Sequence, residues 1–157
     1  MILEYSIYPS PRRTSDQLQA LVPGYATGYW TPGFAYGGGT IGQSYLFQRG
    51  TYIKIGRIIH LFFRVAQSVR GSSTGDVTLT GFPFRTRIDI AGGLGEAVHW
   101  QSMLLNVEYI HIDIPENSII GNFKGTNDVT GESFSLTEAY FSNSTDIRGH
   151  VVYESRE

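Results

Sequence analysis

Residues 57–68, RIIHLFFRVAQS, constrain the fold of this chain more than any other stretch. Their side chains alternate between two sets, and alternation with a period of two predicts a β-strand. One set is wholly apolar and is expected to face the core: Ile59, Leu61, Phe63 and Val65. The other set is mixed, whereas an antiparallel sheet usually keeps one polar face toward water. We therefore expect a partner chain or a second layer to cover this other face, which carries Ile58, His60, Phe62 and Arg64.

The rest of the chain repeats short β-prone runs between turn sequences. Glycine accounts for 19 of the 157 residues, well above its average share of about 7%. The dipeptide Arg49-Gly50 separates QSYLFQ from TYIKIG and predicts a hairpin break. The apolar phase shifts near Asn106, which predicts a bulge or a turn there. About eight to ten strands at this spacing predict an all-β fold, a jelly-roll-like antiparallel β-sandwich.

The first 26 residues differ from the rest and carry the only good helix signal. Thr14 and Gln17 have the spacing of a capping box, and Pro23-Gly24 ends the segment. Its apolar side is formed by Leu18, Leu21 and Val22. A helix this short is marginal alone, so it either packs on its own sheet or belongs to an arm that docks on a neighbouring chain. We therefore divide the chain into an N-terminal arm with a short helix, residues 1–26, and a β-sandwich domain, residues 27–157.

Composition excludes several kinds of site. The chain has no cysteine, so disulfides, thiolate chemistry and cysteine-based zinc sites are ruled out. No run of Lys and Arg offers a face for phosphates, so we expect no nucleic-acid partner. No apolar stretch approaches the length that spans a bilayer, and the N-terminus lacks the pattern of a signal peptide. We expect no membrane insertion.

The sequence gives no catalytic or metal-binding motif. The four histidines, His60, His99, His111 and His150, do not have the spacing of a known metal site. The run GSSTG lacks the form of a nucleophile elbow, and GGLGE lacks the ending of a phosphate loop. Candidate carboxylates for glycan hydrolysis fall mostly in expected loops. We expect no cofactor, no metal and no catalytic residue, and we keep a glycan-cleaving enzyme as a distant alternative.

Residues 27–84 carry five motifs in order: TGYWTP, FAYGGG, SYLFQRGTYIKIG, RGSSTG and LTGFPF. This series resembles a β-rich domain that recurs near the C-termini of bacteriophage tail fibres and tail spikes. The motif residues are Trp30, Pro32, Gly37, Gly38, Tyr52, Lys54 and Pro83. Pro32 is expected to interrupt pairing at a strand edge, and the glycines to allow positive φ. Trp30 either covers the core or offers an exposed stacking platform for a sugar ring.

The resemblance implies a surface protein of the phage virion, usually a homotrimer and often implicated in contact with host glycans. The mixed set Ile58, His60, Phe62 and Arg64 then becomes the candidate trimer interface. The leading hypothesis is a non-enzymatic tail-fibre or tail-tip component that binds a host receptor. The alternative is a capsid decoration protein or head fibre, anchored to the shell by the N-terminal arm.

Two segments, GEAVHWQ and EAYFSNSTD, combine aromatic rings with polar neighbours, which is the usual composition of a site for a polar ligand. The candidate ligand-binding residues are His99, Trp100, Gln101, Tyr140 and Asn143. The competing interpretation places Trp100 and Tyr140 in the core.

Overall fold

The computed structural model describes residues 14, 17, 20–89, 92–127 and 129–157. The regular elements named within these residues are ten strands and one 3-10 helix, η1 (Glu138–Tyr140). The strands are β1 (Ala26–Trp30), β2 (Gly33–Tyr36), β3 (Ser44–Ile55), β4 (Ile58–Val69), β5 (Val77–Thr80), β6 (Gly93–Met103), β7 (Ile110–Ile114), β8 (Gly121–Thr126), β9 (Ser133–Ser135) and β10 (Phe141–Glu154). The expected all-β fold is confirmed.

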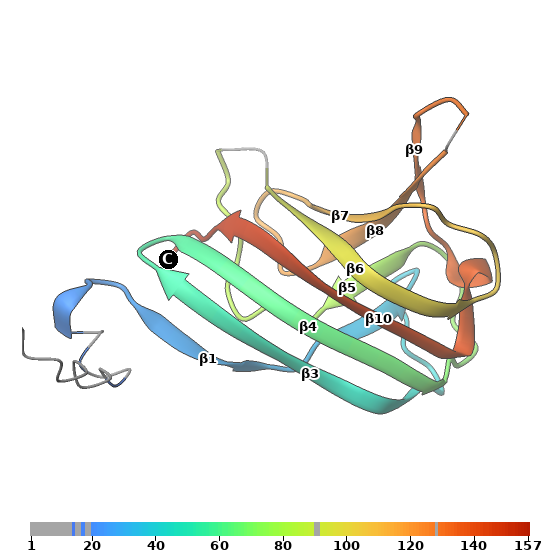
Figure 1. Cartoon of the computed structure of the whole chain (residues 1–157), viewed down its shortest axis with the longest axis horizontal. Coiled ribbons are helices and arrows are strands. Elements are labelled where there is room, and N and C mark those ends of the chain that lie inside the picture. The colour runs from blue at the N-terminus through green and yellow to red at the C-terminus, as the bar shows by residue number, and fades with distance from the viewer. Residues whose placement is uncertain (1–13, 15–16, 18–19, 90–91, 128) are drawn as a thin grey trace, which may run out of the picture.

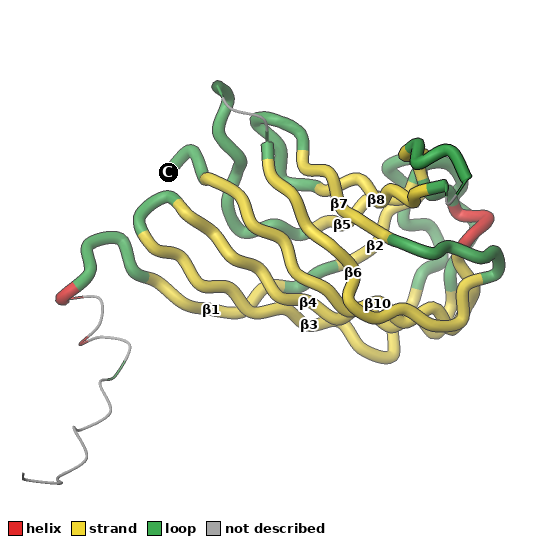
Figure 2. The backbone as a smooth tube through the Cα atoms, turned by 45° about the horizontal axis from the view of Figure 1, so that its top comes forward, coloured by secondary structure: helices red, strands yellow, loops and turns green. Residues whose placement is uncertain are grey.

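The strands pair antiparallel throughout, in the order β1-β3-β4-β10-β6-β7-β8-β5-β2, with β9 beside β8. β1 and β2 stand at opposite ends of this order, yet only Thr31 and Pro32 separate them in the chain. The sheet must therefore curl until its two edges meet at that corner. The curl produces two facing layers, as Figures 1 and 2 show. We call β1, β3, β4, β10 and β6 the front layer, and β7, β8, β5 and β2 the back layer.

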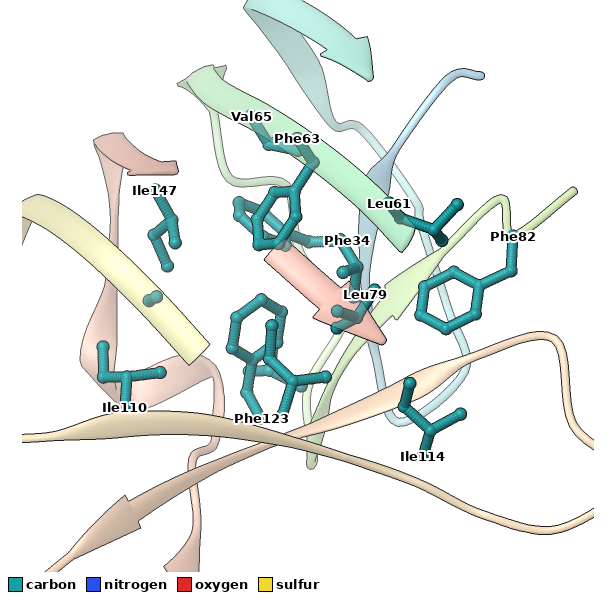
Figure 3. Packing of buried hydrophobic residues seen from close by; sticks show 14 of the residues in the cluster. Phe34, Leu61, Phe63, Val65, Leu79, Phe82, Ile110, Ile114, Phe123 and Ile147 are labelled. Atoms are coloured by element: carbon teal, nitrogen blue, oxygen red, sulfur yellow. The ribbon is translucent and has the colours of Figure 1, made fainter. Parts of the chain in front are cut away.

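The core lies between the two layers. The inward set expected for β4 is confirmed, because Ile59, Leu61, Phe63 and Val65 are all buried. Figure 3 shows β4 side chains pointing toward those of β7 and β8, such as Ile110 and Phe123. Phe141 joins the layers, since its ring meets those of Phe34, Tyr36 and Phe123 edge to face. Such aromatic contacts add to the free energy gained by apolar burial.

Trp30 is a core residue and not an exposed platform. Its indole is buried and packs on Phe63 and Phe82. The ring lies directly over Gly50, where an added Cβ would stand 2.1 Å from Nε1. The hairpin break expected at Arg49-Gly50 is therefore wrong, because β3 runs through it as one strand. Gly50 interrupts the side-chain pattern to make room for the indole, and not to turn the backbone.

The other motif residues fix turns and the end of the chain. Gly37 and Gly38 have φ of +57° and +82° and form the centre of a tight turn closed by hydrogen bonds between Tyr36 and Gly39. Pro32 lies in the β1–β2 corner, and Pro83 follows β5. Both interrupt strands, as expected. Tyr52 packs edge-on against Phe84. Lys54 donates hydrogen bonds to Ser155 Oγ and to the backbone oxygen of Glu157.

The expected arm, residues 1–26, falls largely outside the described residues, and so do its docking contacts. Thr14 and Gln17 exchange the two hydrogen bonds of a capping box. Leu21, on the expected apolar side, is exposed. Among the described residues, no helix has the length and apolar character needed to cross a membrane.

Candidate functional site

The outer face of the front layer is unusually apolar. Its strands expose eleven large apolar side chains. We call eight of them the front-face patch: Tyr29, Ile53, Ile55, Ile58, Phe62, Leu94, Val98 and Val152. These residues come from all five strands of the layer. Single exposed apolar residues are ordinary, but a contiguous patch of this kind marks an interaction site.

The back layer provides an internal comparison, because the strand register continues from one layer to the other. Glu96 of β6 pairs with His111 of β7, which pairs with Lys124 of β8. Leu94 pairs with Asp113, and Asp113 with Asn122. The same face of one sheet thus changes from apolar to polar between β6 and β7. The outer face of the back layer is polar, as expected for a face of an antiparallel sheet that meets water. The outer face of the front layer has instead the composition of a face that is covered.

Aromatic and imidazole rings gather at the centre of the front-face patch. The rings of His60 and Phe62 stack with centroids 4.3 Å apart, and the His150 ring lies 5.3 Å from that of His60. His60 Nε2 is shielded from solvent and has no hydrogen-bond partner among the described residues. Burial, and next the charge of His150, lower the pKa of His60 below its ordinary value of 6.5. His60 is therefore held neutral at pH 7.

Two shallow hollows flank Phe62 on this face. One, of about 430 Å³, is lined by residues of β1 and β3, with Tyr29 and Ile53 at its walls. The other, of about 290 Å³, lies between Phe47 and Arg64. Thr51 and Phe62 line both hollows, so the two form one continuous depression. A depression with apolar and aromatic walls is suited to receive side chains of a partner.

Arg64, placed in the mixed set by the sequence, is held by a carboxylate. Its guanidinium makes two hydrogen bonds to Asp146, at 3.2 and 2.8 Å, and lies over the Phe47 ring. Asp146 is only 3% exposed. Burial alone would raise the pKa of Asp146, but the hydrogen bonds and charge of Arg64, with help from Arg148, hold it below its ordinary value. Asp146 belongs to the segment EAYFSNSTD, which was expected to bind a ligand, but its pairing with Arg64 was not predicted, because 82 positions separate the two residues.

A third hollow, of about 370 Å³, opens where β6 passes into the loop before β7. We call it the β6 hollow. Trp100 and Gln101 line it together with the loop residues Asn106 and Glu108. Trp100 is half-buried and packs against the core with part of its ring. An indole beside amide and carboxylate groups fits the composition of a polar-ligand site.

The backbone of the β6 hollow is held in a constrained shape. Ser102 has φ of +58°, a left-handed conformation that is uncommon outside glycine. Its carbonyl accepts hydrogen bonds from Ser142 Oγ at 2.6 Å and from Thr145 Oγ1 at 3.1 Å. Both donors lie where the β10 register is irregular opposite β6. Strain that is fixed by surrounding contacts is typical of functional sites.

The structure separates the other predicted ligand residues from the β6 hollow. Tyr140 packs on Phe134, and its carbonyl accepts a hydrogen bond from the Leu104 backbone. Asn143 accepts a hydrogen bond from the Arg70 backbone and so ties β10 to the end of β4. His99 is exposed and pairs with Arg148 in the strand register. Within the described residues, no group of three or more His, Asp or Glu side chains has the arrangement of a metal site.

The sequence of the chain matches no family model and no curated protein. Its fold, in contrast, is similar to that in the crystal structure of the Dettilon tailspike protein, with a TM-score of 0.64 and 14% sequence identity. The likeness covers 83% of this chain and 24% of the tailspike, so the chain spans about a quarter of that protein's length. The two proteins share the curled antiparallel sheet.

Proposed function

We propose that this chain is a non-enzymatic surface protein of a bacteriophage virion, a homotrimeric tail-fibre or tail-tip component that binds a host-receptor glycan. The observation that carries the proposal is the likeness of fold to a phage tailspike over 83% of the chain. The motif series in residues 27–84 supports the same conclusion independently, and the front-face patch gives the trimer a surface to bury.

Four of the described carboxylates are held in structural contacts and are not free to act in hydrolysis. Asp146 is occupied by Arg64, and Asp89 and Glu154 are both occupied by Arg87. Glu138 accepts a hydrogen bond from the Gly75 backbone. Glycoside hydrolysis needs two carboxylates free to act on opposite sides of the scissile bond. We assign the glycan instead to the β6 hollow, with Trp100 as the stacking ring and Gln101, Asn106 and Glu108 as hydrogen-bonding groups.

Replacing Trp100 with alanine is expected to weaken glycan binding at least about tenfold, because a central aromatic ring supplies a large share of the affinity of such a site. Binding of the purified chain to host surface polysaccharide is measured by titration calorimetry. Leu104→Ala is the matched control, since Leu104 is exposed on the same loop but does not line the β6 hollow. Equal binding by both variants would contradict the assignment of the site.

The position in the virion is tested by labelling phage particles with a gold-tagged antibody against this chain. Label on the tail or its tip is the expected result. Label spread over the head would contradict the tail assignment and favour a decoration protein or head fibre. In that case, deletion of residues 1–22 should abolish attachment to the particle while the sheet remains folded.

A further inference from the structure

The hollows of the front layer lie on its β1–β3 side, where the exposed ring of Tyr29 forms one wall, and further apolar side chains project on its β6 side. On the side of β6, Leu94 and Val98 protrude, with exposed fractions of 69% and 64%. A face with projecting apolar side chains at one edge and apolar depressions at the other is complementary to a rotated copy of itself.

Charges follow the same division. On β3, Arg49 lies over the Tyr29 ring, and no ion pair of the described residues includes it. On β6, the partly exposed carboxylate of Glu96 accepts a hydrogen bond of 3.1 Å from the Tyr109 hydroxyl and makes a long contact of 3.9 Å with His150, but no Lys or Arg of the described residues pairs with it. A copy whose β6 side met the β3 side of its neighbour would bring Glu96 toward Arg49. A contact of two different surfaces closes into a ring when the rotation allows it.

We propose that the front-face patch is buried against second copies of this chain, β6 side to β3 side, and that the His60–His150 pair makes this interface open on mild acidification. The proposal rests on the proposed function only in taking the assembly to be a ring of identical chains. It adds that the β6 side of one copy meets the β3 side of the next, and that mild acidification separates them.

The surroundings of the histidine pair explain the response to acid. Six charged side chains belong to the outer face around the pair: Arg64 from β4, Arg49 from β3, Arg148, Asp146 and Glu154 from β10, and Glu96 from β6. β1 contributes Thr27 and Tyr29, which carry no charge at neutral pH. Three cations thus face three carboxylates, and Asp146 is already held by Arg64 and Arg148. Added protons on the two imidazoles, whose rings lie 5.3 Å apart, would repel each other, and a neighbouring copy would remove the water that stabilises them.

Acid favours separation of the chains because the free chain binds protons more readily than the assembled one. Burial lowers the pKa of His60 in the single folded chain, and the cover of a second copy lowers it further. Above pH 7, His60 is neutral in both states because its pKa lies below 6.5, and assembly costs it no deprotonation. As the pH falls through the lowered pKa that His60 has in the separated chain, the separated chain binds this proton first, so the equilibrium shifts toward separation.

The test measures the assembly of the full chain by sedimentation velocity at pH 7.5 and pH 5.5. For the wild type we expect the concentration at half-dissociation to rise roughly tenfold or more at the lower pH. The double variant His60→Gln/His150→Gln should lose this dependence, and the matched pair His99→Gln/His111→Gln should keep it. His150→Gln alone, which alters the more exposed ring, should reduce the dependence if the double variant folds poorly.

Three further outcomes separate the parts of the proposal. Arg49→Glu and Glu96→Arg should each weaken the assembly, and the two together should restore it; absence of rescue would overturn the edge-to-edge arrangement. A wild type that assembles equally at both pH values would overturn the acid response alone. A wild type that is monomeric at pH 7.5 would contradict the trimer of the proposed function itself.

Discussion

Phe62→Asp should convert the assembled protein into single folded chains. Phe62 lies at the centre of the front-face patch and lines both hollows beside it. A carboxylate there would lose the apolar contacts of the ring and would be removed from water in the assembly, and removing a charge from water costs several kcal/mol. We expect the concentration at half-dissociation to rise about 100-fold or more. Light scattering coupled to gel filtration gives the mass, and circular dichroism checks that the sheet is intact.

The control for Phe62→Asp is Val129→Asp, which places the same charge on a highly exposed loop residue outside the front layer. It should leave the assembly unchanged. Leu94→Asp tests the other edge of the same face and also provides an answer if Phe62→Asp aggregates. An assembly that survives both substitutions would show that this face is not the interface.

Trp30→Ala should cause the largest loss of stability among single substitutions of the motif residues. Removal of a buried tryptophan typically costs about 3–5 kcal/mol, through lost apolar burial and the cavity left behind. The variant also loses the two hydrogen bonds that the Trp30 indole Nε1 donates to the backbone oxygens of Thr51 and Phe62. The free energy of unfolding is measured by urea titration at one fixed protein concentration.

Ile41→Ala is the control, since Ile41 is exposed in the loop after the glycine turn and should change stability by less than about 0.5 kcal/mol. Gly50→Ala tests the same contact from the other side, because the added methyl group would collide with the indole. We expect it to destabilise the chain as well. If Trp30→Ala cost no more than Ile41→Ala, Trp30 would be a surface ring rather than a part of the core.

Local pattern predicted several individual strands and turns, although it wrongly predicted a hairpin at Arg49-Gly50. The buried face of β4 could be predicted because side chains alternate along any strand, whatever it pairs with. Val77 and Leu79 alternate in the same way along β5, and both are buried. The turn at Gly37 and Gly38 followed from the need for positive φ. The shift of apolar phase near Asn106 marked a real turn, since β6 ends at Met103 and β7 begins at Ile110.

The candidate sites were only partly predictable. Trp100 and Gln101 adjoin in sequence and share the β6 hollow, so a short segment was enough to find them. Tyr140 and Asn143 have a composition equally suited to a ligand site. In the structure, however, the Tyr140 ring packs on Phe134, and the Asn143 side chain accepts a hydrogen bond from the Arg70 backbone. Ser102 and its two hydroxyl donors gave no signal, because their importance depends on β10 lying beside β6.

The sequence by itself determined that this chain forms strands, which faces of the central strands are buried, and where glycine must turn the backbone. These properties depend on residues within a few positions of one another. Only the tertiary structure decided that the last strand, β10, lies between β4 and β6, that Gly50 receives the Trp30 indole, and that Asp146 holds Arg64. Each of these contacts joins residues 20 (Trp30 and Gly50) to 96 (Ile58 and Glu154) positions apart in the sequence, and the curl of the sheet, which no local pattern records, brings them together.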